Sequence, residues 1–447
     1  MGKFFGTDGI RGVANRDLTC ELAFKTGQAA AIVLSRECKH RAKIYIGKDT
    51  RISSDMLENA LAAGISSVGA EVGLLGFIPT PAVAYLTVAH GADAGVVISA
   101  SHNPMEFNGI KIFGARGYKL PDAIEDEIES IILGETPALC VGAEIGRVRH
   151  MEDCAAEYER YITKTIDGDL SGLRVLFDCA NGASFKTAPQ IFEALGIDAD
   201  FIHNDPNGIN INANCGSTHM GILQGQVVSG GYDAGIAFDG DADRCLVVDE
   251  TGAIVDGDRI MAVCANALKH EGKLPHDTFV ATVMSNLGLH AYAKEHGLHI
   301  ECAAVGDRNV LEMMQRGGFV LGGEQSGHVI FLKHSTTGDG ELTAVQYLKI
   351  LKDCGMKASE LTGEIEQYPQ VIINISVKNE CKASVMQNTE VCEIIKEESA
   401  KLGNDGRIFV RASGTEPLVR VMVEGKEPAL VNSVAGTVAN VIERVSK

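Results

Sequence analysis

Short apolar runs along the chain are followed by polar turns and then by amphipathic stretches, a pattern that predicts strands leading into helices. The run Ile44–Ile46 precedes a polar turn and a predicted helix over about 54–68. The same pattern begins again at Val175–Phe177 and at Phe279–Val283. Strand, turn, helix and strand again is typical of βαβ units in mostly parallel, covered sheets. The three starts therefore predict three similar α/β domains.

The pattern changes in the last part of the chain. Strands are predicted at 371–377, 407–411 and 418–423, and long helices at 383–402 and 429–445. Fewer strands combined with two helices that do not alternate with them regularly indicate an α+β arrangement. We therefore expect a smaller C-terminal α+β domain.

Three connecting segments divide the chain, at 135–146, near Asp249–Gly252 and near 363–369. A chain of 447 residues is too long for a single core, and three or four domains are expected. The fold class is therefore predicted to be α/β, with mostly parallel mixed sheets in the first three domains. The predicted domains span residues 1–150, 151–252, 253–367 and 368–447.

Composition and charge exclude several classes of partner. The chain is 45% hydrophobic and 22% charged, which is ordinary for a globular protein, and disorder is not expected. Its formal net charge of −19 argues against nucleic acid or an anionic membrane as the main partner, since both need a basic field. A small phosphorylated ligand needs only a few converging Arg and Lys side chains, so it stays compatible with this charge.

Cysteine usage and hydropathy indicate the compartment. The twelve cysteines are scattered singly from Cys20 to Cys392 without a C-x-x-C pair, which favours reduced core thiols over a zinc site or a disulfide framework. The opening residues reach Gly6 and Asp8 too soon for a signal sequence, and no run of about 18 apolar residues exists. We therefore expect a cytoplasmic protein.

Three aspartates at alternate positions, Asp239, Asp241 and Asp243, directly precede Arg244. With Glu250 at the twelfth position the run superficially fits an EF-hand, but Arg244 stands where that loop needs glycine. The run instead forms a tight loop between two strand-like segments, and three like charges there would repel unless a cation binds. A solvated acidic turn is the alternative. Oxygen ligands favour magnesium, with manganese as a second choice.

The segment Ser99–Pro104 follows a predicted strand at 95–98, and so lies at a strand's carboxyl end, where α/β proteins bind ligands. Ser101 is the candidate nucleophile, although serine is also a common turn or N-cap residue. His102 is either catalytic or structural. Lys111 is either a surface charge or a proton donor and phosphate contact whose pKa neighbouring cations would lower. With the acidic run, this segment predicts phosphoryl transfer through a phosphorylated serine.

Two further glycine-containing loops are candidate ligand sites. In Gly322–His328, Glu324 and Ser326 could bind sugar hydroxyls, although a glycine-rich hairpin explains the pattern equally well. The loop Arg411–Pro417 combines a guanidinium, hydroxyls and backbone N–H groups, which favours phosphate binding over a plain turn. The chain has no G-x-x-x-x-G-K-[ST] loop, so nucleotide hydrolysis of that type has no support.

Taken together and in this order, the motifs resemble the α-D-phosphohexomutase superfamily over the whole chain. The resemblance rests on Phe5–Gly12, the Ser101 loop, Asp239–Arg244, Gly323–His328 and Arg411–Thr415. The opening octet, Thr282–Gly288 and Gln325 resemble the glucosamine branch specifically, rather than the phosphomannomutase/phosphoglucomutase branch.

This resemblance implies four domains around a central cleft, the first three built alike. It implies interconversion of glucosamine 6-phosphate and glucosamine 1-phosphate for UDP-N-acetylglucosamine and cell-wall precursor synthesis. Ser101 would be phosphorylated and would exchange its phosphoryl group with the sugar through a glucosamine 1,6-bisphosphate. One Mg²⁺ would be held by the phosphoserine together with Asp239, Asp241 and Asp243.

The resemblance also implies roles for the remaining candidates. Lys111 and His328 would be the general acid/base groups, and His102 is grouped with them as catalytic. Arg11 and Arg244 would stabilise the phosphoserine, while Glu324 and Ser326 would bind sugar hydroxyls. The phosphate that is not reacting would be bound by Arg411, Ser413, Gly414, Thr415 and Arg420. The expected partner is a small phosphosugar, and a homodimer is compatible with the resemblance.

Three other functions stay open at this point. The first is a phosphomannomutase/phosphoglucomutase, because no single residue identifies the substrate amine. The second is a phosphosugar-binding regulator without turnover, which would be expected to lack Ser101, Lys111 or one of the aspartates. The third is a magnesium-dependent phosphatase, which would need a dedicated base for water, and the sequence indicates none.

Overall fold

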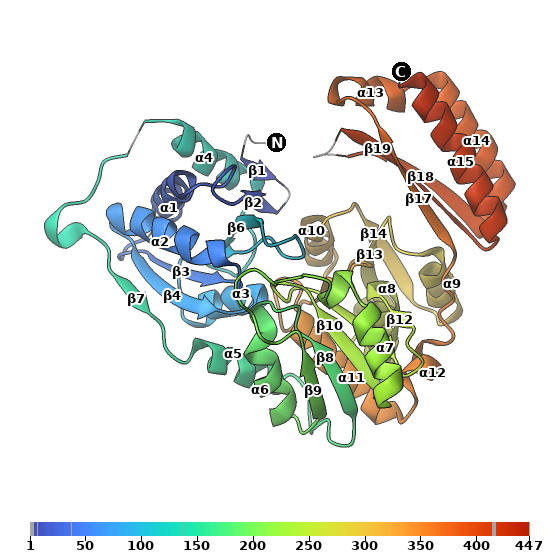
Figure 1. The fold of residues 1–447 in the computed structure, drawn as a ribbon, viewed down its shortest axis with the longest axis horizontal. Helices are drawn as coiled ribbons and strands as arrows, with labels where there is room; N and C mark the ends of the chain where they lie inside the picture. The colour runs from blue at the N-terminus through green and yellow to red at the C-terminus, as the bar shows by residue number, and fades with distance from the viewer. Residues whose placement is uncertain (1–3, 7, 37, 136, 414–416, 447) are drawn as a thin grey trace. The chain divides into compact units, whose positions relative to one another are not determined.

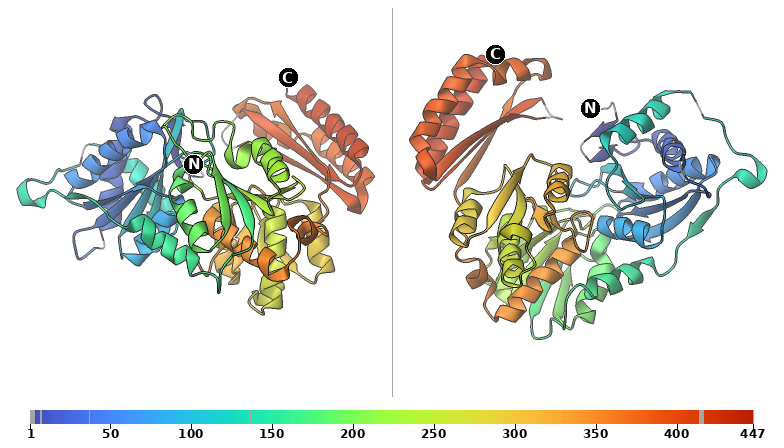
Figure 2. Two further views of the ribbon diagram at one scale, coloured as in Figure 1. Left: turned by 60° about the horizontal axis from the view of Figure 1, so that its bottom comes forward. Right: turned by 180° about the vertical axis from the view of Figure 1, so that it is seen from behind.

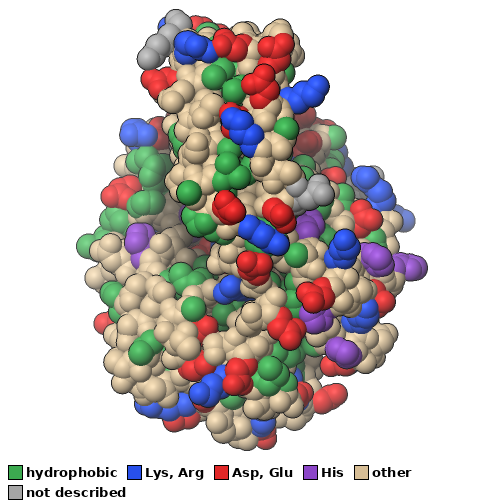
Figure 3. All heavy atoms as spheres, turned by 90° about the vertical axis from the view of Figure 1, so that its right-hand side faces the viewer, with side chains coloured by type: hydrophobic (Ala, Val, Ile, Leu, Met, Phe, Trp, Pro, Cys, Tyr) green, Lys and Arg blue, Asp and Glu red, His purple; other side chains and the backbone are tan. Residues whose placement is uncertain are grey.

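The computed structural model describes residues 4–6, 8–36, 38–135, 137–413 and 417–446 (Figure 1). It divides into two compact units, one made of 1–284 with 297–364 and the other of 285–296 with 365–447. Within the described ranges, no helix is both long enough and apolar enough to cross a membrane. On the face drawn in Figure 3, acidic and basic side chains are interspersed rather than gathered by sign.

The first sheet has seven strands in the order β1-β2-β6-β5-β3-β4-β7. Strands β3, β4, β5 and β7 pair in parallel, whereas β1, β2 and β6 form an antiparallel edge. The bounds are β1 Phe5–Gly6, β2 Gly9–Val13, β3 Lys43–Lys48, β4 Glu71–Phe77, β5 Ala94–Ile98, β6 Phe107–Gly114 and β7 Val148–His150, with helices α1 Cys20–Ser35, α2 Ile52–Ser67, α3 Thr80–Ala89 and α4 Asp122–Leu133.

Helices cover both faces of this sheet because residues alternate sides along each strand. Ile44 and Ile46 point into the core shared with α1 and α2. On the other face, Gly47 and Gly95 lie against Val83 of α3, and a Cβ at either position would come within 3.0 Å of that side chain. The two glycines therefore allow α3 to pack closely on the sheet.

The second sheet has the order β12-β11-β10-β8-β9, with β8 parallel to both β9 and β10 and antiparallel pairing beyond β10. Stacked rings of Phe177, Phe192 and Phe238 fill one side of it. The bounds are β8 Arg174–Asp178, β9 Asp198–Ile202, β10 Ala234–Phe238, β11 Cys245–Asp249 and β12 Ile254–Val255, with helices α5 Cys154–Thr163, α6 Thr187–Ala194 and α7 Gly221–Gly230.

The third sheet has the order β14-β13-β15-β16, parallel except for the β15–β16 pair. Val280, Val310, Met314 and Ile330 belong to its core. The bounds are β13 Thr278–Thr282, β14 His299–Ala303, β15 Leu321–Gly323 and β16 Val329–Phe331, with helices α8 Gly257–His270, α10 Asp307–Gly317, α11 Gly340–Cys354 and α12 Ala358–Thr362.

The second unit contains an antiparallel sheet in the order β17-β19-β18, and α14 and α15 pack against it in one core (Figures 1 and 2). Helix α9 also belongs to this unit, since Asn286 at its N-terminus donates from Nδ2 to the carbonyl of Tyr368 at 3.0 Å. The bounds are α9 Leu287–Glu295, β17 Gln370–Ser376, α13 Lys382–Met386, α14 Thr389–Leu402, β18 Gly406–Ala412, β19 Leu418–Gly425 and α15 Pro428–Val445.

The predicted fold class is confirmed, whereas some helix bounds were wrong. The single helix predicted at 383–402 is two helices, because Asn388 caps α14 by accepting from the N–H groups of Glu390 (2.9 Å) and Val391 (3.4 Å). The helix predicted over about 54–68 lies at Ile52–Ser67. Short 3₁₀ turns complete the chain at η1 Gly142–Glu144, η2 Ala183–Phe185, η3 Gly216–Thr218, η4 Pro275–Asp277, η5 Asn379–Cys381 and η6 Gly403–Asp405.

Candidate active site

Ser101 lies in the tight loop between β5 and β6, at the carboxyl end of β5 as the sequence predicts. Its side chain is only 1% exposed, and its backbone N–H donates to Ser99 Oγ at 2.9 Å. Its φ of 52° lies in the left-handed region, which is unfavourable for a residue with a Cβ. Such backbone strain is often found where a loop holds a functional group in place.

Two side chains that the sequence analysis missed hold this loop. The guanidinium of Arg51 donates from Nη2 to the carbonyls of Ser101 (3.1 Å) and Asn103 (2.6 Å). Asn212 donates from Nδ2 to the same two carbonyls, at 2.9 and 3.1 Å. Arg51 is fully buried and is paired with the buried carboxylate of Asp49. The Ser101 loop is therefore fixed from two sides by buried donors.

The aspartates Asp239, Asp241 and Asp243 lie in the loop between β10 and β11. All three are buried, and one carboxylate oxygen of each lies within 4.8 Å of the others. The hydroxyl of Ser101 donates to Asp239 Oδ2 at 2.6 Å. The structure therefore brings together the two motifs that the sequence places about 140 residues apart.

The electrostatics of these carboxylates suit a hard divalent cation. Burial, together with repulsion from Asp243 and Asp241, raises the pKa of Asp239 to about 8. Within the described part of the chain, Asp241 Oδ1 and Asp243 Oδ1 are buried without a hydrogen-bond partner. Oxygen-only donors with unused lone pairs are what Mg²⁺ takes from proteins. The residues present therefore fit the expected ion.

Lys111 on β6 is buried beside the aspartates. Its Nζ donates to Asp241 Oδ2 at 2.9 Å and lies 3.3 Å from Asp8 Oδ2 and 3.6 Å from Asp243 Oδ2. Burial alone would lower the pKa of this amine, but the three carboxylates raise it above its usual value. The expectation of a pKa lowered by neighbouring cations was therefore wrong, since acidic groups dominate its surroundings.

His328 directly precedes β16 and faces the aspartates. Its Nδ1 lies 3.6 Å from Asp243 Oδ2, and its Nε2 accepts a hydrogen bond from the N–H of Gly338 at 3.0 Å. Because Nε2 must offer a lone pair to that donor, the ring proton is on Nδ1 and faces Asp243. A Cβ at position 338 would lie 2.5 Å from the ring, so glycine is required there. Sequence reasoning missed Gly338.

The two predicted arginines come from different segments, Arg11 from β2 and Arg244 from the loop between β10 and β11. Arg11 on β2 forms an ion pair with Asp8, whose carboxylate also faces Lys111. The backbone N–H of Arg244 donates to Asp239 Oδ1 at 3.2 Å, and its Nε lies 3.9 Å from Asp243 Oδ1. Both guanidinium groups also line the cavity next to Ser101.

His102 lies beside the candidate nucleophile, with Nδ1 3.2 Å from Ser101 Oγ. Burial and the nearby charges of Arg244 and Arg11 lower its pKa to about 4. The imidazole is therefore neutral near pH 7 and can exchange a hydrogen bond with the hydroxyl.

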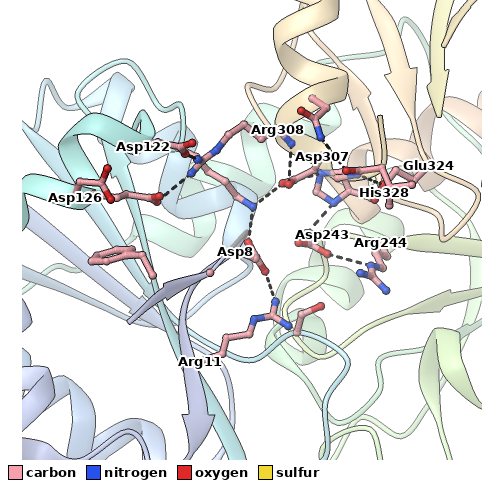
Figure 4. A pocket seen from close by; sticks show the side chains of 18 residues that line it. Asp8, Arg11, Asp122, Asp126, Asp243, Arg244, Asp307, Arg308, Glu324 and His328 are labelled. Atoms are coloured by element: carbon pink, nitrogen blue, oxygen red, sulfur yellow. Dashed lines mark hydrogen bonds and ion pairs between the residues drawn. The ribbon is translucent and has the colours of Figure 1, made fainter. Parts of the chain in front are cut away.

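A cavity of about 470 Å³ opens next to Ser101 (Figure 4). Glu324 lines it, and its Oε1 accepts from the N–H of Gly306 at 3.0 Å. Ser326 does not line this cavity, and its buried Oγ has no hydrogen-bond partner within the described residues. Predicted residues that line the cavity are Arg11, Ser101, Asp243, Arg244, Glu324 and His328, and charged residues that were not predicted are Asp8, Lys119, Asp122, Glu125, Asp126, Asp307 and Arg308.

Lys119 joins two of these unpredicted charges. Its Nζ contacts Asp307 Oδ2 at 2.5 Å and also pairs with Asp8. Burial would lower its pKa, but the carboxylates of Asp8 and Asp307 raise it. Asp8 and Asp307, both labelled in Figure 4, are thus linked through Lys119. Asp8 lies within the Phe5–Gly12 motif, whereas Lys119 and Asp307 lie outside the predicted motifs and only their charged residue types could have indicated them.

In the second unit, Arg411 on β18 lies opposite Arg420 on β19. Burial and the charge of Arg420 lower the pKa of Arg411, and its buried Nε has no hydrogen-bond partner within the described residues. Like charges directly opposite each other destabilise a sheet, and an anion would relieve this repulsion. The carbonyl of Ser413 accepts from Lys382 Nζ at 2.6 Å. Gly414 and Thr415 lie outside the described residues.

Four family models cover almost the whole chain. They are described as phosphoglucomutase/phosphomannomutase alpha/beta/alpha domains I, II and III and C-terminal domain, and they match residues 2–138, 156–252, 256–368 and 372–441. The chain belongs to the phosphoglucomutase/phosphomannomutase family. As a member of this family the protein is an enzyme, an isomerase, and the resemblance read from the sequence is confirmed.

Relatives with closely similar sequences are named phosphoglucosamine mutases. Those of Acetivibrio thermocellus and Ruminiclostridium cellulolyticum are each 56% identical over 445 residues, which is 99% of this chain and of each relative. The Caldicellulosiruptor bescii protein is 52% identical over 448 aligned positions, again 99% of both.

Solved structures share the fold at lower identity. A phosphoglucomutase/phosphomannomutase family protein from Burkholderia thailandensis has a TM-score of 0.81 at 22% identity and covers 98% of this chain and 97% of its own. Aspergillus fumigatus N-acetylphosphoglucosamine mutase, solved in complex with GlcNAc-6P and magnesium, has a TM-score of 0.73 at 17% identity, covering 100% and 96%.

Proposed function

We propose that this family member acts as a phosphoglucosamine mutase, interconverting glucosamine 6-phosphate and glucosamine 1-phosphate. The observation that carries the proposal is the buried Ser101 hydroxyl, 2.6 Å from Asp239 within a cluster of three aspartates. The names of relatives that are more than half identical over 99% of the chain support the choice of substrate.

In this proposal Ser101 is carried as phosphoserine. A free sugar hydroxyl attacks the phosphorus and passes its proton to a base, while the bond to Ser101 Oγ breaks and an acid protonates that oxygen. The resulting glucosamine 1,6-bisphosphate reorients and gives its other phosphate back to Ser101. Each half-reaction forms one P–O bond and breaks one, so no co-reactant is consumed. Catalysis of this kind depends on positioning and on cationic stabilisation of the transferring group.

The residues around Ser101 suit these steps. Asp239, Asp241 and Asp243, with a phosphoserine oxygen, would hold Mg²⁺, which supplies positive charge beside the transferring phosphoryl group. Arg11 and Arg244 add positive charge from the cavity wall. Lys111 and His328 are the proposed acid and base, because both are buried next to the aspartates. His102, neutral beside Ser101, is proposed to orient the hydroxyl.

The remaining roles extend the same proposal. Glu324 and Ser326 would bind sugar hydroxyls. Arg411, Ser413, Gly414, Thr415 and Arg420 of the C-terminal unit would bind the phosphate that is not reacting. The product would supply UDP-N-acetylglucosamine and cell-wall precursor synthesis in the cytoplasm, and the protein would act alone or as a homodimer.

The discriminating experiment compares kcat/KM for glucosamine, glucose and mannose 6-phosphates in coupled assays with a catalytic amount of the matching 1,6-bisphosphate. The proposal predicts the highest value for the glucosamine substrate, by at least about tenfold, which corresponds to about 1.4 kcal/mol of preferential transition-state binding. A higher value for glucose or mannose 6-phosphate would favour the phosphoglucomutase/phosphomannomutase activity instead. Stoichiometric release of inorganic phosphate would indicate a phosphatase.

A further inference from the structure

A second group of metal-ligating side chains lies outside the reaction site, in the part of the chain that carries the second sheet. Asp178 ends β8, His203 directly follows β9, and Cys215 lies on the segment that returns toward β10. One ligand atom from each lies within 4.8 Å of the others. Asp178 and Cys215 are fully buried, and the His203 side chain is 23% exposed. The mutase chemistry uses none of them.

The carboxylate of Asp178 is held in place by backbone donors. Its Oδ1 accepts from the N–H of Ala180 and its Oδ2 from the N–H of Gly216, both at 2.9 Å. The same Oδ2 lies 2.9 Å from His203 Nδ1, although the ring N–H direction does not form an aligned hydrogen bond. Hydrogen bonds that fix a ligand's orientation in advance are characteristic of metal sites.

Without a cation, these three side chains do not all have a favourable partner. The buried Cys215 Sγ has a 4.0 Å contact from Asn181 Nδ2, and the buried His203 Nδ1 has no hydrogen-bond partner within the described residues. A buried thiol and an imidazole thus lie beside one negative charge, that of the carboxylate. A divalent cation would replace the thiol proton and would take the thiolate, the neutral imidazole and the carboxylate as ligands.

We propose that Asp178, His203 and Cys215 form a binding site for a divalent cation of the zinc class. Mixed sulfur, nitrogen and oxygen donors select such ions, whereas the all-oxygen aspartate cluster beside Ser101 suits Mg²⁺. Zinc bonds of about 2.0 Å to N and O at a tetrahedral angle place those atoms about 3.3 Å apart, close to the 2.9 Å observed. The Sγ lies within 4.8 Å of both atoms, against about 3.5 Å expected for a zinc–sulfur bond of about 2.3 Å, so it would move by up to about 1.3 Å.

Cation binding would fix the segment 203–215, which contacts the Ser101 loop through Asn212. Asn212 lies between His203 and Cys215 in sequence, and its N–H donates to the carbonyl of Ala180 at 2.9 Å. Its side chain donates to the carbonyl of Ser101. A cation bound by Asp178, His203 and Cys215 would therefore attach both ends of the segment 203–215, which contains Asn212, to the end of β8. We assign the ion a structural role in holding that segment.

The chain offers a matched control for the test. Cys38, His40 and Asp93 form a second cluster of the same residue types, with Cys38 Sγ 3.2 Å from Asp93 Oδ1 and the His40 ring exposed. Its carboxylate also accepts from the backbone N–H of Lys43. Cys38→Ala removes the thiol of this less buried cluster without touching the proposed site.

The experiment titrates Co²⁺ into the full-length, chelator-treated protein with Mg²⁺ in excess. We expect one Co²⁺ to bind with a thiolate-to-metal charge-transfer band, in the wild type and in Cys38→Ala alike. His203→Ala and Cys215→Ala should lose the band and bind at least about tenfold more weakly. The oxygen-only cluster at Ser101 cannot produce this band, so binding there is not mistaken for binding at the proposed site.

X-ray absorption of the zinc-loaded wild type and Cys38→Ala gives a reading that does not depend on whether the ligand variants fold. One sulfur at about 2.3 Å in both supports the site. No sulfur ligand in Cys38→Ala, or a charge-transfer band that survives in folded His203→Ala, would overturn it. The Asp178–His203 contact would then be an ordinary ion pair.

Discussion

At the scale of single residues, the orientation of His328 depends on a neighbour without a side chain. Gly338→Ala would place a Cβ 2.5 Å from the ring and displace the ring from its present position beside Asp243. Displacement of a catalytic group by about 1 Å can cost about 10²-fold in rate, so we expect kcat to fall by that order with a smaller change in KM. Steady-state kinetics would measure this.

Gly225→Ala is the matched control, because position 225 lies within α7 and a Cβ there meets nothing within 4 Å. Its activity should equal that of the wild type. A Gly338→Ala enzyme with kcat within twofold of wild type would show that His328 does not need this contact.

Asp339, next to Gly338, predicts a pH effect on stability. Its Oδ1 accepts from Tyr158 Oη and from the N–H of Leu342, both at 2.9 Å, yet burial raises its pKa to about 7. The folded state therefore holds this proton up to a higher pH than the unfolded state, whose pKa is about 3.9. Stability from this group is present at low pH and is lost as the pH rises from about 4 to 7.

Asp339→Asn keeps an acceptor oxygen but cannot ionise. The free energy of unfolding of the wild type, relative to that of this variant, should fall as the pH rises, by at most about 1.4 kcal/mol per pH unit. The difference between the two proteins should become constant above pH 7. Urea denaturation of both proteins between pH 5 and 8 measures the difference. Parallel curves for the two proteins would contradict the assignment.

At the scale of elements, the Ser101 loop depends on donors from other segments. Asn212 has a φ of 57° and Asn214 a φ of 56°, so glycine relieves backbone strain at either position. Only Asn212→Gly also removes the amide that binds the carbonyls of Ser101 and Asn103. We expect kcat to fall by about tenfold or more in Asn212→Gly and to stay unchanged in Asn214→Gly.

Kinetic assays and thermal unfolding midpoints of both variants distinguish loss of the Asn212 hydrogen bonds from loss of the folded structure. Equal kcat values in the two variants would mean that Arg51 alone suffices to hold the loop.

Element types could be predicted where the apolar pattern and local signals agree. The strands before Ser101 and on both sides of Asp239–Asp243 follow from short apolar runs, and the structure has them there. The break before α14 was not predicted, because the amphipathic pattern continues through Asn388 and only its side-chain cap ends the preceding segment. Helix bounds depend on such single hydrogen bonds.

At the scale of the whole molecule, what the sequence could predict of the site was limited to residues in contiguous motifs. Ser101 and the aspartates were predicted because a serine at the end of a strand indicates a nucleophile, and three alternating aspartates between two strands indicate a cation site. Arg51 and Asn212 were missed, because they contact Ser101 across 50 and 111 positions in the chain and carry no motif of their own. The domain boundaries and the roles assigned to site residues stay predictions.

The central claim is that Ser101 carries the phosphoryl group during turnover. The most direct measurement incubates the protein with glucosamine 1,6-bisphosphate labelled in both phosphates, followed by peptide mapping and a chase with unlabelled glucosamine 6-phosphate. We predict one labelled phosphate on the peptide that contains Ser101, its loss into sugar bisphosphate during the chase, and no labelling of a folded Ser101→Ala variant. Label on another residue, or isomerisation by a protein that never becomes labelled, would contradict the account.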